Sequence, residues 1–307
     1  MRQRLSSRLI AVTALVAALT ACSFGYSAAK GGKKTIVTTY SVLGAVVKDL
    51  VGDAFEVKSA IPNGLDVHEW EPSAKDIEAL TKADLVVENG LDLEGGMGKA
   101  LDQARAAKVP FFTASDHVTV RTVGAGEGIP SGDPDQAVGA KDPHLWTDPL
   151  AIKAVVDALA IKIKKDFGVD LSARTADLDK RLAALDTEVR NKVNALPAER
   201  RKLVTGHESL GYFAQRYGFK LVGAVIPSLT TQAESSAASL AALKKLINQN
   251  NVKVVFTETG TPARTVEALA KEAKVTAIPL STHKLPADGS YFTFERELAD
   301  TIIKGLK

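Results

Sequence analysis

Histidine is the residue type in this sequence best suited to chemistry, because a neutral imidazole is a common ligand of transition metals. The chain has five of them: His68, His117, His144, His207 and His283. Two share one setting, with an aspartate two residues before the histidine, a tryptophan two residues after it and a proline that opens a helix shortly beyond: Asp66-His68-Trp70 and Asp142-His144-Trp146. Both tryptophans of the chain are used in this way, so the repeat predicts that His68 and His144 serve one shared site.

The flanking residues suggest how such histidines would be held. In an extended segment, residues two apart point to the same side. The aspartate or a backbone group would then orient the imidazole and the indole would shield it, as a metal ligand requires. For either histidine taken alone, a loop residue that is hydrogen-bonded to the backbone is the simpler interpretation. The occurrence of the same Asp-x-His-x-Trp setting twice is what favours a functional site.

Two further histidines follow predicted strands. His207 comes after the strand at 202–205, and His283 comes after the strand at 275–280. The carboxyl ends of strands are where open α/β sheets bind ligands. Four neutral imidazoles that converge on one ion form a closed tetrahedral set, which suits zinc. His117 lacks these features and is expected at the surface.

The N-terminal segment is predicted to be an export signal. Residues 1–21 carry Arg2, Arg4 and Arg8 ahead of an apolar run of about 13 residues, too short to span a bilayer. The run ends in Leu-Thr-Ala-Cys22, which resembles the lipobox of bacterial lipoproteins, so Cys22 is the predicted lipidation point and anchors the chain to the membrane. A free thiol in a signal cleaved elsewhere is the alternative.

Cleavage would also change the charge. Removing residues 1–21 brings the formal net charge from +3 to zero, so nothing indicates a nucleic-acid surface. Cys22 is the single cysteine, so an internal disulfide is excluded. The next stretch, 22–34, is rich in Gly, Ser, Ala and Lys and is predicted to be a flexible tether.

Strand and helix patterns alternate along the rest of the chain, which predicts an α/β fold with mainly parallel sheets. We expect a first lobe over 35–170 and a second over 198–307. Predicted strands occupy 35–39, 55–61, 84–88, 109–113, 202–205, 219–226, 252–256 and 275–280.

A long helix from Ser172 to Leu196 is predicted between these lobes. Its apolar residues form a narrow stripe, and Pro197 ends it. We interpret 171–197 as a linking helix that joins two lobes, with a site in the cleft between them. The alternative is an ordinary surface helix of a single domain.

Several segments resemble the metal-binding solute-binding proteins of bacterial zinc and manganese ABC importers, the group called cluster A-I. The resemblance covers nearly all of the chain after the signal and rests on Gly64–Pro72 (GLDVHEWEP), Ala83–Gly90 (ADLVVENG), Asp142–Trp146 (DPHLW), His207–Gly218 and Gly289–Tyr291. It implies two βα lobes joined by one rigid helix, a single metal in the cleft, no enzymatic activity, and delivery of the metal to an ABC permease outside the cytoplasm.

The resemblance also implies a ligand set. His68, His144 and His207 match three family ligands, and histidine rather than glutamate at the third position favours Zn²⁺ over Mn²⁺. The fourth ligand is usually an aspartate, whereas here His283 holds that place, and Glu258, Asp288 or water are the alternatives. The loop at 124–140 lacks the histidines of many zinc-specific members, so Mn²⁺ stays open.

Two other functions are alternatives for a chain with these residues. A zinc hydrolase could use Glu69 or Glu208 as a base, but the chain has no His-Glu-x-x-His helix and His283 would close the site to water. A surface adhesin lipoprotein with an incidental metal is the other alternative. We expect a monomeric binding protein.

Overall fold

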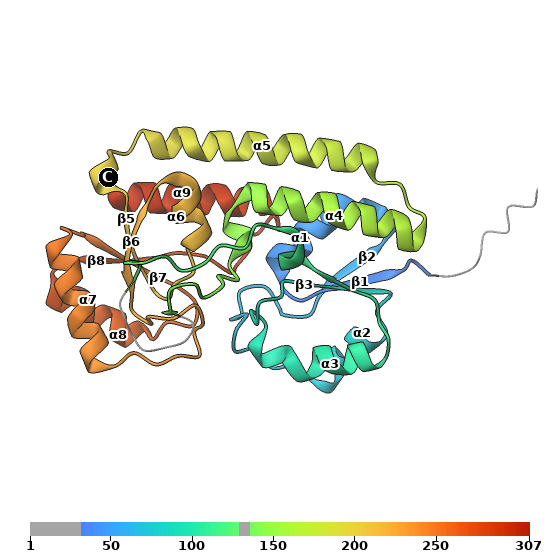
Figure 1. The fold of residues 1–307 in the computed structure, drawn as a ribbon, viewed down its shortest axis with the longest axis horizontal. Coiled ribbons are helices and arrows are strands. Elements are labelled where there is room, and N and C mark those ends of the chain that lie inside the picture. The colour runs from blue at the N-terminus through green and yellow to red at the C-terminus, as the bar shows by residue number, and fades with distance from the viewer. Residues whose placement is uncertain (1–31, 129–135) are drawn as a thin grey trace, which may run out of the picture. The chain divides into compact units, whose positions relative to one another are not determined.

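The strands fall into two groups along the chain (Figure 1). The computed structural model describes residues 32–128 and 136–307, and Lys33–Lys307 form one compact unit. The first group is a parallel sheet of order β2-β1-β3-β4. The second holds two parallel pairs, β5-β6 and β7-β8. The strand bounds are β1 Thr35–Thr38, β2 Glu56–Ser59, β3 Leu85–Glu88, β4 Phe111–Thr113, β5 Lys202–Thr205, β6 Lys220–Ala224, β7 Val254–Thr257 and β8 Thr276–Pro279.

A helix follows most strands, as parallel pairing requires. The helices are α1 Ser41–Val51, α2 Ala74–Thr81, α3 Gly98–Ala106, α4 Pro149–Phe167, α5 Ser172–Asn194, α6 Gly211–Tyr217, α7 Ala237–Gln249, α8 Ala263–Ala273 and α9 Tyr291–Leu306. The predicted α/β class with parallel sheets is confirmed. In the described part of the chain, every helix is too short or too polar to cross a bilayer.

Helix α5 occupies the predicted position and connects the two strand groups. Its stripe residues are buried: Leu178, Leu182, Leu185, Val189 and Val193. They pack against α4, α9 and α1, and Figure 1 shows α5 running alongside α4 and α9. At 1.5 Å per residue the helix is about 35 Å long, enough to span both groups. The division into lobes at 35–170, 171–197 and 198–307 stays a prediction.

Local sequence explains where the helix that follows His144 begins and ends. The Asp148 side chain accepts a hydrogen bond from the Leu150 N–H at 2.8 Å, and Pro149 is the first helical residue of α4. Gly168 ends the helix in the left-handed conformation, with φ of 71°. The start of α4 is thereby fixed next to the segment that carries His144.

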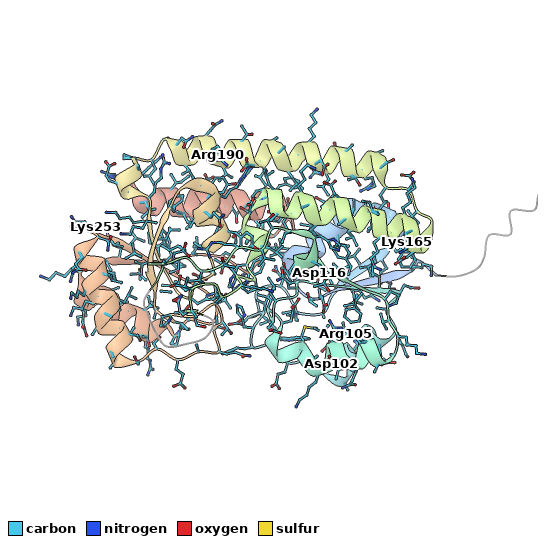
Figure 2. All side chains as sticks on the ribbon, viewed as in Figure 1. Asp102, Arg105, Asp116, Lys165, Arg190 and Lys253 are labelled. Carbon is cyan, nitrogen blue, oxygen red and sulfur yellow. The ribbon has the colours of Figure 1, made fainter. Side chains whose placement is uncertain are left out.

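Charged side chains lie on the outer faces of these layers. On α3, Leu101 and Ala104 are buried whereas Asp102 and Arg105 are exposed, and Figure 2 labels this charged pair. Arg105 also contacts the buried Glu88 at the end of β3, at 2.7 Å. The predicted signal peptide, Cys22 and most of the tether lie outside the described residues, as does part of the loop at 124–140.

Candidate metal site

Four of the five histidines come together between the two strand groups. The ligand-capable atoms of His68, His144, His207 and His283 all lie within 4.8 Å of one another. All four side chains are buried, with at most 2% of each residue exposed. His68 lies in the loop between β2 and α2 and His144 just before α4, whereas His207 follows β5 and His283 follows β8.

Two of the distances between Nε2 atoms match those between ligands around one small ion. His144 Nε2 lies 3.4 Å from His68 Nε2 and 3.2 Å from His207 Nε2. Tetrahedral Zn²⁺ with Zn–N bonds of about 2.05 Å places its nitrogen ligands roughly 3.3 Å apart. His283 Nε2 is buried and has no hydrogen-bond partner among the described residues. A buried ring nitrogen of this kind is available to a metal.

Asp142 orients His144 in the predicted way. One carboxylate oxygen, Oδ1, lies 2.9 Å from both Nδ1 and the backbone N–H of His144. The other, Oδ2, accepts a hydrogen bond from the buried Arg121 at 3.1 Å. Asn89, within one of the resemblance segments, donates to the Pro143 carbonyl at 2.8 Å. His144 is therefore held with Nδ1 turned away from the cluster and Nε2 toward it.

At His68 a backbone group orients the ring, one of the two arrangements expected, because the ring hydrogen-bonds to the backbone of Leu93. Asp66 accepts from the backbone N–H of His68 at 2.9 Å, and no contact joins its carboxylate to the His68 ring. Residues 67–69 form a turn rather than an extended segment, so residues two apart do not share a side there. The His68 carbonyl instead accepts from Gly96 N–H at 3.0 Å and from Gln232 Nε2 at 2.8 Å.

Trp146 does shield two of the histidines. Its ring lies 5.3 Å from that of His144 and 5.5 Å from that of His283, between ring centroids. The indole N–H donates to the Thr282 carbonyl at 2.8 Å, and Tyr291 Oη donates to the Trp146 carbonyl at 2.9 Å. Trp146 thus connects the segment of His144 to the loop of His283.

The Glu258 carboxylate lies on the Nδ1 side of the His207 ring and does not belong to the ligand cluster. Its Oε2 lies 3.0 Å from His207 Nδ1, and the carboxylate also accepts from Gly206 N–H and Ser209 Oγ. Gly206 has no room for a side chain, since a Cβ would lie 2.1 Å from Thr261 Oγ1. From sequence, Glu258 is expected only as an alternative fourth ligand. It directly follows β7, and this place at the carboxyl edge is the sequence feature that points to its position beside His207.

Burial and neighbouring charges set the protonation of the cluster. Burial, together with the other histidines, lowers the pKa of His68 and His283 well below the ordinary value. Burial also lowers the pKa of His144, although Asp142 opposes this. For His207, burial lowers the pKa, but the nearby carboxylates, Glu258 first and then Asp66 and Glu208, together raise it above the ordinary value. Three of the rings are thus held neutral, the form that binds metal.

The remaining candidates lie elsewhere. His117 is exposed, as expected, and stacks on Phe112 with ring centroids 4.6 Å apart. Asp288 is exposed and accepts from the Ser290 N–H and Thr293 Oγ1 at the start of α9, so it does not reach the cluster. A pocket of about 460 Å³ is lined by His68, Asp92 and Lys141 among others, so the cluster borders a cavity on the side of His68.

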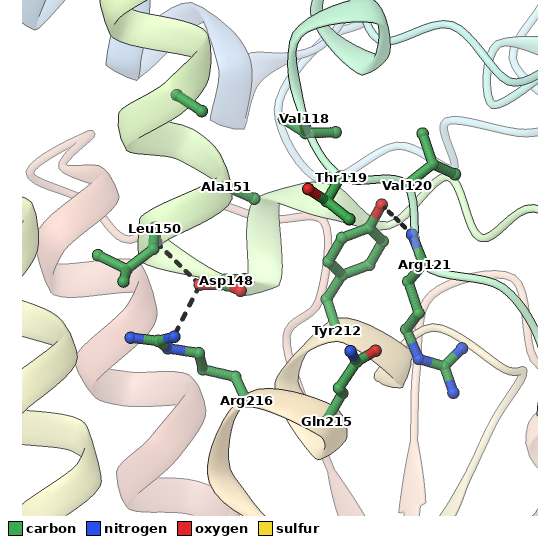
Figure 3. Close-up of a pocket in the computed structure, with 11 residues that line it drawn as sticks. Val118, Thr119, Val120, Arg121, Asp148, Leu150, Ala151, Tyr212, Gln215 and Arg216 are labelled. Carbon is green, nitrogen blue, oxygen red and sulfur yellow. Dashed lines mark hydrogen bonds and ion pairs between the residues drawn. The ribbon is translucent and has the colours of Figure 1, made fainter.

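A second pocket, of about 390 Å³, lies apart from the histidines (Figure 3). Tyr212 Oη accepts from the Arg121 N–H at 3.0 Å, and Arg216 lies 3.7 Å from Asp148. Both arginines already have carboxylate partners, Asp142 for Arg121 and Asp186 for Arg216. This pocket therefore offers no unpaired charge to a ligand.

Comparisons with known proteins agree with this geometry. The sequence matches the family model described as "Zinc-uptake complex component A periplasmic" over residues 36–305. The zinc-binding protein TroA of Treponema pallidum (strain Nichols) is 33% identical over 247 residues, covering 79% of this chain and 75% of TroA. The manganese ABC transporter substrate-binding lipoprotein PsaA of Streptococcus pneumoniae is 29% identical, with 99% of each chain covered.

A solved structure gives the same result. The periplasmic zinc binding protein TroA from Treponema pallidum superposes with a TM-score of 0.75 at 29% identity, over 90% of this chain and 99% of that one. The resemblance seen in the motifs is confirmed, and the family is one of substrate-binding proteins for transport, so the hydrolase alternative is wrong. This chain belongs to the family of periplasmic A components of zinc-uptake complexes.

Proposed function

We propose that this protein captures one Zn²⁺ outside the cytoplasm with His68, His144, His207 and His283 and delivers it to an ABC importer. The observation that supports this most strongly is the spacing of the Nε2 atoms, 3.2 and 3.4 Å, in a fully buried cluster. The ion is cargo, and a site closed by four protein ligands holds it without a reactive water.

Zinc fits this cluster better than manganese does. Four imidazole nitrogens in a small tetrahedral group suit Zn²⁺, whereas Mn²⁺ prefers carboxylate and water oxygens in octahedral geometry. The nearest carboxylates, those of Asp142 and Glu258, face the Nδ1 side of His144 and His207. The relatives include one named for zinc and one named for manganese, so their names do not decide between the metals. The preference for Zn²⁺ rests on the ligand atoms of this chain.

The membrane attachment is part of the same proposal. We place the protein on the outer face of the cytoplasmic membrane, held by a lipid on Cys22 and tethered by residues 22–34, where it acts as a monomer beside its permease. The support is the lipobox-like Leu-Thr-Ala-Cys22 and the lipoprotein named among the relatives.

Calorimetric titration of the purified chain tests the site. We expect one Zn²⁺ per chain and much weaker Mn²⁺ binding. His68→Ala and His207→Ala should each weaken zinc binding at least 100-fold, because a lost ligand leaves the site open. His117→Ala is the matched control and should bind as the parent does. Unchanged affinity in His68→Ala and His207→Ala would overturn the proposal.

A further inference from the structure

The loop that carries His283 is anchored at a residue outside the ligand cluster. This loop, 280–290, runs from β8 to α9 without regular structure. On one side of His283, the Thr282 carbonyl accepts from the buried Trp146 indole at 2.8 Å. On the other side, both backbone groups of Leu285 are bound by the side chain of Asn63.

The Asn63 contact is a paired one. Asn63 Nδ2 donates to the Leu285 carbonyl at 3.0 Å, and the Leu285 N–H donates to Asn63 Oδ1 at 2.8 Å. Ser41 Oγ also donates to Asn63 Oδ1, at 3.1 Å, which fixes the orientation of the amide. The Asn63 side chain therefore bonds both the N–H and the carbonyl of Leu285, in the loop that carries His283.

The two segments also pack closely beside this pair. Gly64, next to Asn63, has φ of 86°, and a Cβ at this position would lie 3.2 Å from Lys284 Cδ. Leu285 is itself buried in the hydrophobic core. Asn63 lies in the same β2–α2 loop as His68, so the contact joins the loop of one candidate ligand to the loop of another.

We propose that Asn63 is a positioning residue that latches the His283 loop and so controls how quickly the site releases its ion. This inference rests on the proposed zinc site. With the latch intact, both sides of His283 are anchored and its ring stays against the other three. With the latch open, only the Thr282 side stays anchored, by the Trp146 indole and by the Thr282 hydroxyl, which donates to Glu258 at 3.2 Å, and His283 can leave the ion. The rate of release, rather than capture, should depend on Asn63.

Asn63→Ala is a clean test because Asn63 is exposed and packs in no core. Both neutral hydrogen bonds to Leu285 are lost, together with the one from Ser41, so we expect Zn²⁺ to leave the protein about tenfold faster into excess chelator, with the association rate nearly unchanged. The matched control is Asn191→Ala, which removes an exposed asparagine of α5 and should release zinc at the parent rate. Without metal, Asn63→Ala should still unfold cooperatively, with a thermal midpoint lowered by about 4 °C or less, and Asn191→Ala should unfold at the parent midpoint.

Cobalt(II) separates positioning from a general loss of stability. Co²⁺ held by four imidazoles is tetrahedral and absorbs strongly in the visible range, whereas departure of His283 lets two or more waters bind, which raises the coordination number and weakens the bands. We expect weaker bands in Asn63→Ala and parent bands in Asn191→Ala. Parent-like release and spectra in Asn63→Ala would overturn the latch while leaving the zinc site standing. A parent protein that takes up neither ion would instead overturn the proposed function.

Discussion

At the scale of single residues, the feature that matters most is the asymmetry among the four imidazoles. Burial keeps His68, His144 and His283 neutral by lowering their pKa, whereas the Glu258 carboxylate raises the pKa of His207. The pKa of Glu258 is in turn lowered, because His207 and its hydrogen bonds outweigh burial. Three rings are therefore ready for a metal near neutral pH, and His207 is the one that must lose a proton first.

This asymmetry predicts how zinc binding depends on pH. Protons compete with the metal for a ring nitrogen, so affinity should fall as the pH drops through the raised pKa of His207, by about tenfold per unit at most. Glu258→Gln removes the charge that raises this pKa, so the fall should begin at a lower pH. Competition titrations against a chelator between pH 8 and 5 measure both curves. Identical curves for the parent and Glu258→Gln would contradict this assignment.

At the scale of elements, α9 carries a buried acid that the metal site does not use. Glu295 is fully buried, and its Oε2 has no hydrogen-bond partner among the described residues. Burial, and secondarily Asp148, raises the pKa of Glu295 well above its ordinary value. Tyr217 Oη, likewise buried and unpartnered, belongs to the same region of the core, where burial and Glu295 raise its pKa.

A raised pKa in the folded state has a definite sign for stability. Between the unfolded and folded pKa values of Glu295, the folded chain binds more protons, so stability falls as pH rises through that window. Glu295→Gln removes this loss and should raise the free energy of unfolding at pH 7 by about 1 kcal/mol, with little effect at pH 4. Denaturant unfolding at the two pH values measures this.

The control for that comparison is Glu297→Gln, an exposed glutamate on the same helix. It should leave the free energy of unfolding within about 0.5 kcal/mol of the parent at both pH values. If Glu295→Gln instead lowers the free energy of unfolding at pH 7, favourable contacts hold the Glu295 carboxylate ionised. The predicted direction of the pKa shift and of the stability change would then be wrong.

The elements were predictable because their signals are local. The stripe on α5 and the proline that opens α4 are read directly from the sequence, and the structure confirms both. The environment of His68 was not predictable in the same way. The extended pairing of Asp66, His68 and Trp70 fails because residues 67–69 turn, and the groups that bind the His68 carbonyl come from distant segments.

At the scale of the whole unit, the site depends on contacts between residues far apart in sequence. His68 and His144 precede α5, and His207 and His283 follow it. The sequence predicts His68 and His144 in loops that open a helix and His207 and His283 after strands. It holds no signal for the contact of Asn63 with Leu285, 222 positions away. Such contacts depend on how loops from both strand groups meet, which no local pattern encodes.

Because ligands come from both sides of α5, bound zinc should stabilise the unit as a whole. An ion that binds only the folded state at 100 times its Kd adds about 2.7 kcal/mol to the free energy of unfolding. For a chain of this size that is a rise in Tm of about 5 °C or more. Scanning calorimetry with and without zinc measures it. A midpoint unchanged by saturating zinc would mean that the ion does not join the two groups.

The central claim is that four imidazole nitrogens hold one zinc ion, and X-ray absorption at the zinc edge of the loaded protein tests it most directly. We predict a shell of four nitrogens at about 2.0–2.1 Å with the outer-shell scattering of imidazole rings. A five- or six-coordinate shell, or one in which carboxylate or water oxygens replace His283, would contradict the account.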